Sequence, residues 1–257
     1  MKKLIQIILF ILFGVVASTL MGFIIYEHGH QNINEIKIKI SKSDNGGFLS
    51  EESITNIIKE IDSIKTKKIN DLEINLLEKL VSSNPFVNHV DAYININRDL
   101  IINIEEREAL LRIYLPDNSS FYIDKNGNLF PLCNRYTPRL IIANGYINAH
   151  THNSFSTVTD TLYTETELPE IFQLTKIISN NSFLKAQISQ IYVNSIGEYD
   201  LIPELGSHTI RLGNINNIDE KLRNLESFYK KKLVNEGWEK YETINFTYKN
   251  QIVCTKK

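Results

Sequence analysis

The sequence predicts an α+β protein with three parts: an N-terminal transmembrane helix, a small β-α-α-β-β domain, and a mixed α/β domain with a C-terminal edge strand. Three observations lead to this fold class. The 23 residues from Leu4 to Tyr26 carry no charge. Strand-like and helix-like periodicities then alternate between residues 31 and 108. Residues 109–257 combine short β-rich runs with one long amphipathic helix pattern.

The composition is that of an ordinary globular chain and excludes several classes of function. Of 257 residues, 42% are hydrophobic and 23% are charged, which argues against disorder. The formal net charge of -2 gives no general attraction to nucleic acid, whose binding proteins usually carry a basic surface. Cys133 and Cys254 are too few for a disulfide scaffold. We expect them to stay unbonded unless their segments lie side by side, because a disulfide needs Cα atoms within about 7 Å.

The uncharged N-terminal run predicts a membrane-spanning helix at residues 4–26. A spanning helix needs about 20 apolar residues, whereas a cleavable signal peptide has a shorter core that ends at a small-residue cleavage site. No Ala-x-Ala site follows the run, so a cleaved signal peptide is the weaker alternative. Lys2 and Lys3 precede it, and the positive-inside rule therefore places residues 1–3 in the cytoplasm and the remainder outside.

The first elements after this helix follow from hydrophobic periodicity. Ile36, Ile38 and Ile40 alternate with charged residues, which is typical of a half-buried strand. Ser50 can cap a helix, because Glu51 then lies at the positive end of the helix dipole. The apolar positions of this helix are Ile54, Ile57, Ile58 and Ile61.

A second helix and a strand pair complete the small domain. Pro85 ends the second helix, because the residue before a proline avoids helical geometry. The apolar stripe of that helix comprises Leu76, Leu77, Leu80 and Val81. Residues 86–96 and 100–107 alternate as two strands, with the turn at residues 97–99 between them.

The stretch FYIDKNGNLFPL, residues 121–132, presents a choice between a metal loop and a turn. Asp124, Asn126 and Asn128 alternate like calcium ligands. An EF-hand loop needs its glycine at the sixth position and a glutamate at the twelfth, but Gly127 comes fourth and the twelfth position is not acidic. Asn and Gly reach positive φ easily, so we predict a β-hairpin that turns around this glycine.

The order strand, helix, helix, strand, strand after one membrane helix resembles the polypeptide-transport-associated (POTRA) domain of the FtsQ/DivIB cell-division family. LLEKLVSSNPFVNHVDAYIN, residues 76–95, is similar to that family's leucine-rich helix, its Asn-Pro-aromatic-Val corner and the next strand. Glu106 and Arg107 match its Gln/Glu-Arg-x-Pro signature, in which Ala109 here replaces the proline. The resemblance implies a POTRA domain at residues 31–108.

Residues 109–257 resemble the β domain of the same family. The hairpin at 121–132 is similar to its first hairpin, and TPRLIIANG, residues 137–145, to its exit strand. Residues 186–214 are similar to its central strand triplet, with Gly206 and Gly213 at turns. An amphipathic helix follows, whose apolar face holds Leu222, Leu225, Phe228, Tyr229 and Leu233.

The closing segment INFTYKNQIVCTKK, residues 244–257, resembles the last strand of that family. Asn245 and Thr247 stand where the family pattern has Asp and Arg. The segment is long, rich in β-formers and free of proline, and includes Phe246 and Val253 among its hydrophobic positions. A strand of this kind at a sheet edge can accept a strand from a partner.

The resemblance implies a non-enzymatic divisome assembly factor that links cytoplasmic and periplasmic division proteins. It implies a single-pass protein of a bacterial inner membrane, with a periplasmic C-terminus and a septal location. The implied partners are FtsB and FtsL, with FtsB adding a strand to the closing segment at Thr247, Tyr248 and Asn250. To these we add Ile252 as a neighbour. For Tyr248, the alternative is packing on the helix at residues 218–233. No cofactor, metal or small-molecule substrate is implied.

Two other functions fit parts of the sequence. A membrane-anchored enzyme acting on peptidoglycan needs a nucleophile or metal motif, and the chain has no Gly-x-Ser-x-Gly and no His-Glu-x-x-His. A secretion or protein-transport component of the envelope can also use POTRA domains. Such proteins carry several of these domains and a long membrane barrel, whereas this chain has one.

The polar segment at residues 146–167 has no clear period and predicts a loop or an irregular strand pair. A zinc site needs three or four ligands on a rigid frame, and a glycosidase needs two facing carboxylates. A polar loop collects such side chains by composition alone, so we expect neither site. The candidate groups are His150, His152, Asp160, Glu165, Glu167 and, farther along the chain, His208.

Overall fold

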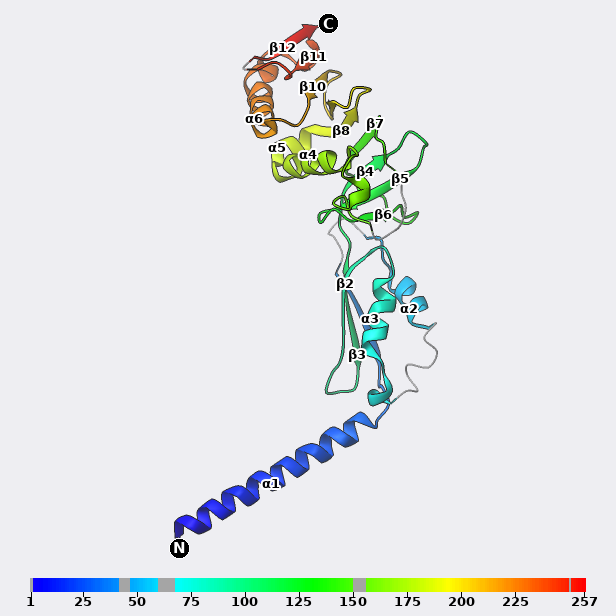
Figure 1. The fold of residues 1–257 in the computed structure, drawn as a ribbon, viewed down its shortest axis with the longest axis vertical. Helices are drawn as coiled ribbons and strands as arrows, with labels where there is room; N and C mark the ends of the chain where they lie inside the picture. The colour runs from blue at the N-terminus through cyan, green and yellow to red at the C-terminus, as the bar shows by residue number, and fades with distance from the viewer. Residues whose placement is uncertain (1, 42–46, 60–67, 150–155, 250) are drawn as a thin grey trace. The chain divides into compact units, whose positions relative to one another are not determined.

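The computed structural model describes residues 2–41, 47–59, 68–149, 156–249 and 251–257 (Figure 1). It divides the chain into two compact units, Met1–Glu106 and Arg107–Lys257. Each unit has its own hydrophobic core.

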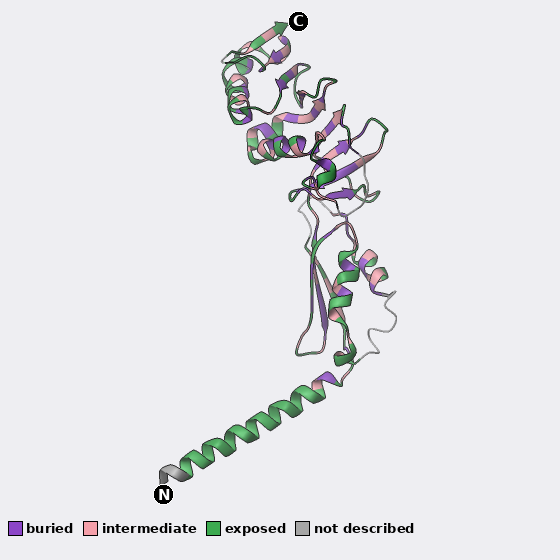
Figure 2. Cartoon of the chain, viewed as in Figure 1, coloured by how far each residue is buried: buried purple, intermediate pink, exposed green. Residues whose placement is uncertain are grey.

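The N-terminal helix α1 (Lys2–Gly29) is apolar and exposed over most of its length (Figure 2). Its segment Ile5–Gly29 has 25 residues and contains an 18-residue stretch with a mean hydropathy of 2.6, so it is long and apolar enough to cross a membrane. The Ser18 hydroxyl donates to the Gly14 carbonyl (2.8 Å), which satisfies a polar group within the helix. This helix fits a single-pass membrane protein.

The rest of the first unit is a three-stranded sheet with two helices, in the predicted order β-α-α-β-β. The strand order is β1-β3-β2, in which β1 is parallel and β2 antiparallel to β3. The elements are β1 (Ile36–Ser41), α2 (Glu51–Lys59), the short η2 (Ile69–Asp71), α3 (Ile74–Ser82), β2 (Val87–Ile94) and β3 (Leu100–Glu106).

Both helices cover the sheet, and α3 does so with a narrower apolar face than the sequence predicts. Ser50 caps α2 as expected, because its hydroxyl accepts the Ser53 N–H (3.1 Å). In α3, Leu77 and Val81 are buried, but the predicted stripe is wrong at the two other leucines, which are 47% and 37% exposed. A nine-residue helix on a three-stranded sheet buries only one line of side chains. The predicted α2 position Ile61 lies outside the described residues.

Glu106 fixes the segment before α2 to the end of β3. Its carboxylate is buried and accepts the N–H groups of Phe48 (2.6 Å) and Leu49 (3.1 Å). A Cβ atom at Gly47 would lie 2.5 Å from this carboxylate, so a larger residue there would have to displace the Glu106 side chain from these hydrogen bonds. The glutamate of the family signature therefore has a structural role.

The second unit is built on a nine-stranded mixed sheet of order β12-β11-β10-β9-β8-β7-β4-β5-β6. Two of its parallel pairs, β7/β8 and β10/β11, are joined by helical crossovers. The strands are β4 (Ala109–Tyr114), β5 (Ser120–Asp124), β6 (Leu129–Pro131), β7 (Ile141–Gly145), β8 (Ile188–Val193), β9 (Tyr199–Pro203), β10 (Thr209–Gly213), β11 (Tyr241–Asn245) and β12 (Val253–Lys256).

The crossovers place helices α4, α5 and α6 along the sheet (Figure 1). The helical elements are η3 (Thr161–Tyr163), α4 (Leu168–Asn180), α5 (Ser182–Gln187), α6 (Ile218–Phe228), the π-helical η4 (Tyr229–Leu233) and α7 (Val234–Glu236). The helix predicted after residue 217 is confirmed, and Leu222, Leu225 and Leu233 on its apolar face are buried. Residues 168–187 form α4 and α5, which the hydrophobic periodicity of the sequence does not predict.

The hairpin predicted at residues 121–132 is confirmed as β5 and β6. Gly127 adopts a φ of 88° in the turn. Asp124 is no free metal ligand, because its Oδ1 accepts the N–H groups of Asn126 and Asn128 (2.8 Å each) and its Oδ2 pairs with Arg107. The alternating Asp and Asn residues therefore build a turn.

Candidate partner-binding edge

The last strand, β12, forms one edge of the nine-stranded sheet. It pairs with β11 in antiparallel register, with Thr255 opposite Thr243 and Val253 opposite Asn245. Within the described parts of the chain, no strand lies on its other side. Val253 is 43% exposed, and Thr255 and Lys256 are also exposed. A strand in this position presents unpaired backbone N–H and C=O groups to solvent.

The prediction of one continuous closing strand is wrong, because β11 and β12 are separate strands joined by a connection. Asn245 ends β11 with its side chain, whose Oδ1 accepts the Thr247 N–H (2.8 Å) and hydroxyl (2.7 Å). This local turn competes with strand geometry. Phe246 is 5% exposed and packs in the core instead of lying along the edge.

The described members of the predicted binding site therefore precede the edge strand in the chain and are not part of it. Thr247 and Tyr248 are in the connection, and Ile252 directly precedes β12 and is half-buried against the core. Tyr248 is 52% exposed. Asn250 lies outside the described residues. Thr255 lies in the edge strand but is not among the predicted binding residues. The β-forming residues that continue after the turn at Asn245 are the sequence feature that could have identified it.

Gly213 lets the connection approach the end of β10. A Cβ atom at Gly213 would lie 2.9 Å from Thr247 Cγ2, and Gly213 has a φ of 71°. Both facts favour glycine at this position. A side chain at position 213 would therefore displace Thr247 and, with it, the start of the connection.

The far end of β12 is tied to the sheet. Lys257 follows the strand, and its Nζ pairs with Glu239 Oε2 (2.6 Å) and donates to the Ser207 hydroxyl. Its N–H donates to the Lys240 carbonyl (3.2 Å). The Lys257 ammonium, with help from Ser207, lowers the pKa of the Glu239 carboxyl. The edge is thus ordered before any partner binds, which reduces the entropy lost on binding.

Glu236 ties β11 to the preceding helix. Its carboxylate pairs with Lys232 and Lys240 (2.7 Å each) and accepts the Tyr241 hydroxyl. Hydrogen bonds from Lys232, then Lys240 and Tyr241, lower the pKa of Glu236 to about 2. The hydrogen bond to Glu236 raises the pKa of Tyr241 to about 12. Both pKa shifts come from hydrogen bonds that join the helical segment before β11 to the start of that strand, and so they have a structural cause.

His208, one of the candidate metal-site or catalytic groups predicted from the sequence, is buried in the second unit. Its Nε2 lies 2.7 Å from the Tyr229 hydroxyl, and the side chain is 1% exposed. Burial lowers the pKa of His208, and the Trp238 backbone and Glu239 oppose this in part. An imidazole held this way serves packing and hydrogen bonding.

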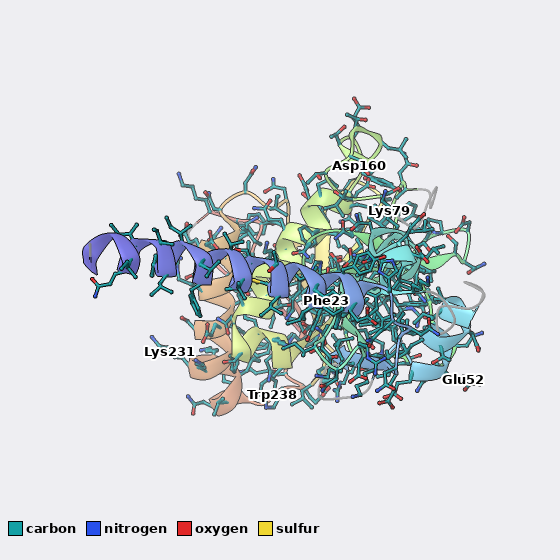
Figure 3. All side chains as sticks on the ribbon, turned by 90° about the horizontal axis from the view of Figure 1, so that it is seen from below. Phe23, Glu52, Lys79, Asp160, Lys231 and Trp238 are labelled. Atoms are coloured by element: carbon teal, nitrogen blue, oxygen red, sulfur yellow. The ribbon has the colours of Figure 1, made fainter. Side chains whose placement is uncertain are left out.

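The other described candidates do not form a common site, because each lies or bonds in a different place within the second unit. Asp160 lies in the loop before α4 (Figure 3) and accepts the Thr157 N–H (2.7 Å). Glu167 accepts the Asn148 N–H (2.8 Å) directly before α4, and Glu165 is exposed. The described residues contain no group of three His, Cys, Asp or Glu side chains that could hold a metal ion. The remaining candidates, His150 and His152, lie outside the described residues.

The Ser-x-x-Lys pattern of serine acyl-transfer enzymes occurs twice in the chain, at Ser182–Lys185 and Ser227–Lys230. All four side chains are exposed on helical surfaces. Lys230 pairs with Glu226 (2.6 Å).

The two cysteines are not joined in a disulfide, and both are half-buried. Cys133 follows β6 at one edge of the sheet, and Cys254 lies in β12 at the other. Eight inter-strand spacings of about 4.8 Å separate these edges along the sheet. The strand order does not bring the two thiols together.

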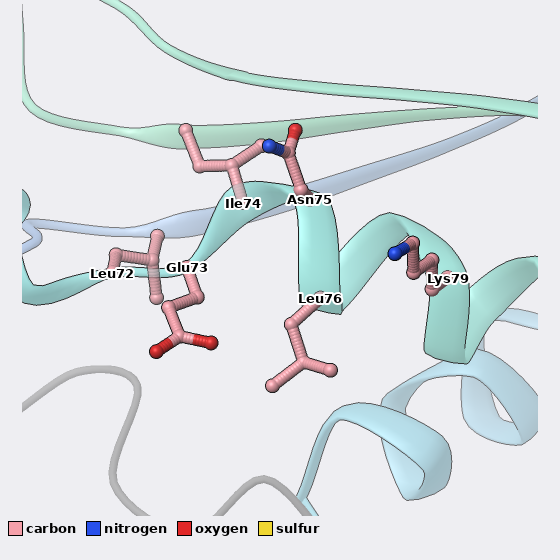
Figure 4. Close-up of a pocket in the computed structure, with 6 residues that line it drawn as sticks. All are labelled: Leu72, Glu73, Ile74, Asn75, Leu76 and Lys79. Carbon is pink, nitrogen blue, oxygen red and sulfur yellow. The ribbon is translucent and has the colours of Figure 1, made fainter.

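In the first unit, a groove of about 460 Å³ lies at the start of α3 (Figure 4). Its polar groups are one carboxylate, one amide and one ammonium, without a second acid or a histidine. The lining residues are Leu72, Glu73, Ile74, Asn75, Leu76 and Lys79. This set provides no pair of groups for acid-base chemistry.

These features define a protein with an apolar N-terminal helix, a POTRA-type unit and a mixed-sheet unit with an open C-terminal edge. Residues 31–105 match the POTRA-like domain family. Residues 108–255 match the family described as "FtsQ/DivIB, C-terminal related". The chain belongs to the FtsQ/DivIB family, a non-enzymatic family of division proteins. Its domains support a role in cell division. No curated protein matches the chain.

Proposed function

We propose that this chain is a non-enzymatic divisome assembly factor that captures a partner strand on β12. The partners in this proposal are FtsB and FtsL, with FtsB as the donor of the added strand. The observation that carries the proposal is the state of β12: it is an exposed, proline-free edge, tied at its far end by Lys257. Backbone groups of such an edge give affinity, and side-chain contacts next to it give specificity.

Capture can be tested directly with residues 31–257 as immobilised bait. We expect retention of the organism's own FtsB and FtsL from detergent extracts, because these supply the extended segment that β12 needs. A bait with native circular dichroism that retains neither protein would contradict the proposal.

The proposal also includes a topology in which residues 1–3 are cytoplasmic, α1 crosses the inner membrane and both units are periplasmic. A reporter that is active only in the cytoplasm, fused after Lys257, should stay silent. A reporter that folds in the periplasm should collect at midcell, where septum formation occurs. A uniform envelope signal would instead favour the secretion alternative.

A further inference from the structure

A rigid turn between β2 and β3 presents the most exposed large hydrophobic side chain of the described residues. Ile96 is 93% exposed, compared with 79% for Phe10 in α1. The turn is held by two backbone bonds between Asn95 and its neighbours, to Asp99 and from Arg98 (3.0 Å each). The Asp99 N–H also donates to the Asn95 side chain (2.9 Å). Ile96 is therefore held outward by a fixed backbone.

Of the charged side chains in the turn around Ile96, the Asp99 carboxylate is paired, whereas the Arg98 guanidinium can bind an anion. The Asp99 carboxylate is 4% exposed and pairs with Lys37 (2.6 Å), so its charge is neutralised. Arg98 adopts a φ of 65°, where Gly or Asn would be less strained. In the described parts of the chain, its guanidinium makes no ion pair. The turn thus combines an exposed isoleucine with an arginine in a strained backbone position, and the fold requires neither.

This turn lies at the end of the sheet where the chain enters from α1. The parallel pairing of β1 and β3 begins with Ile36 opposite Leu100, directly after the turn (Figure 1). The Asn34 N–H donates to the Arg98 carbonyl (2.9 Å). From Tyr26, three helical and five extended residues reach Asn34, which allows a separation of about 21 Å at most.

The linker between α1 and the sheet is itself held in place. The Ile69 N–H donates to the Gln31 carbonyl (3.0 Å). A Cβ atom at Gly29 would lie 2.3 Å from the Asn70 side chain, so the last turn of α1 is in close contact with η2. The chain therefore keeps the β2–β3 turn near the point where α1 leaves the bilayer.

We propose that the β2–β3 turn is a second membrane contact, in which Ile96 enters the interface of the bilayer that α1 spans and Arg98 binds lipid phosphate. Burial of one isoleucine alone is too weak to recruit a free protein to a membrane. The α1 anchor holds the turn at high effective concentration at the surface, so a weak contact is sufficient. An arginine at this depth keeps its charge among the headgroups. The inference rests on membrane insertion of α1 and not on partner capture.

The test uses the full chain in liposomes of phosphatidylcholine and phosphatidylglycerol, with Cys133→Ser and Cys254→Ser. Asn97→Cys carries an environment-sensitive fluorophore next to the intact Ile96. We expect a blue-shifted emission that brominated lipids quench. His89→Cys is the matched control, because it is exposed on the same β2 strand, about 20 Å farther from the turn. Its probe should report water.

Two further variants assign the contact to its residues. Ile96→Ser in the Asn97→Cys background should abolish the blue shift, and Arg98→Gln should abolish its dependence on phosphatidylglycerol. Emission typical of water at position 97, equal quenching at positions 97 and 89, or a shift that appears only after FtsB is added would overturn the proposal. Carbonate extraction reports α1 insertion, and FtsB capture by the same variants reports the proposed function separately.

Discussion

Arg107 and Asp124 form a buried ion pair where the second unit begins. Their side chains are 11% and 3% exposed. The same carboxylate accepts the backbone N–H groups of Asn126 and Asn128 in the hairpin turn (2.8 Å each). One aspartate therefore fixes both the first residue of this unit and the turn of its first hairpin.

Asp124→Ala should lower the free energy of unfolding by about 3–5 kcal/mol, because it breaks a buried ion pair and removes the acceptor of two N–H groups in the hairpin turn. Urea unfolding of residues 31–257, followed by circular dichroism, measures this loss. Lys125→Ala is the control, since it removes the neighbouring Lys125–Glu108 pair, whose side chains are 59% and 55% exposed. An exposed pair contributes about 1 kcal/mol or less. Equal losses in both variants would show that burial does not determine the strength of these pairs.

The sequence predicts elements well where a local pattern determines them. The Asn-Gly turn gives the hairpin at residues 121–132, and alternating isoleucines give β1. The pairing of Arg107 with Asp124 has no such signal, because the hairpin brings the two residues together only in the folded sheet. Sequence reasoning assigns Arg107 to a family signature and Asp124 to a turn.

Two errors have different causes: one is a helix missed after a polar segment, and the other is a β-forming pattern that continues past the end of a strand. α4 follows a polar segment without a period, although Pro169 in its first turn and the buried positions Leu168, Ile171, Leu174 and Ile178 are a usable helix signal. After Asn245 the β-forming residues continue, so the residue pattern alone gives one strand. The side-chain hydrogen bonds of Asn245 end β11, and a propensity argument does not include them.

Gly213→Ala should destabilise the second unit and also reduce partner capture. Its new Cβ would meet Thr247 Cγ2 at 2.9 Å. The hydroxyl of Thr247 is bonded to Asn245, so the side chain cannot rotate away without losing that bond. Gly197→Ala is the control, with a similar φ of 76° but open space around the Cβ position. It should lose only about 1–2 kcal/mol from backbone strain. Equal effects would mean that the contact with Thr247 is unimportant.

His208 should make stability depend on pH below neutrality. Burial lowers the pKa of His208 in the folded state, whereas the unfolded chain protonates near the ordinary value of 6.5. Between these two values the unfolded state binds more protons, so the free energy of unfolding falls as the pH falls below about 6.5. Urea unfolding at several pH values measures this decline.

His208→Gln should flatten that decline, because a glutamine amide can bond to Tyr229 but does not titrate in this range. A pH dependence that is unchanged in this variant would assign the effect to other groups. The nearby charges to consider are Glu239 and Lys257.

Tyr248→Ala should weaken capture of the partner while leaving the fold intact. Tyr248 is 52% exposed in the connection that precedes β12. A half-exposed tyrosine at such a position is a typical interface anchor, and truncation of an anchor costs about 2 kcal/mol, or roughly 30-fold in Kd. Tyr146→Ala is the control, because Tyr146 is 60% exposed but follows β7, four strands away from β11.

Val253→Lys tests the edge itself. A lysine on an edge strand disfavours the addition of another strand, and Val253 is already 43% exposed, so the substitution should not disturb the core. We expect Val253→Lys and Tyr248→Ala each to reduce binding of FtsB in a titration with residues 31–257, whereas Tyr146→Ala binds normally. If both edge variants keep their circular dichroism and still bind FtsB with unchanged Kd, strand addition at β12 is wrong and the partner binds elsewhere on the chain.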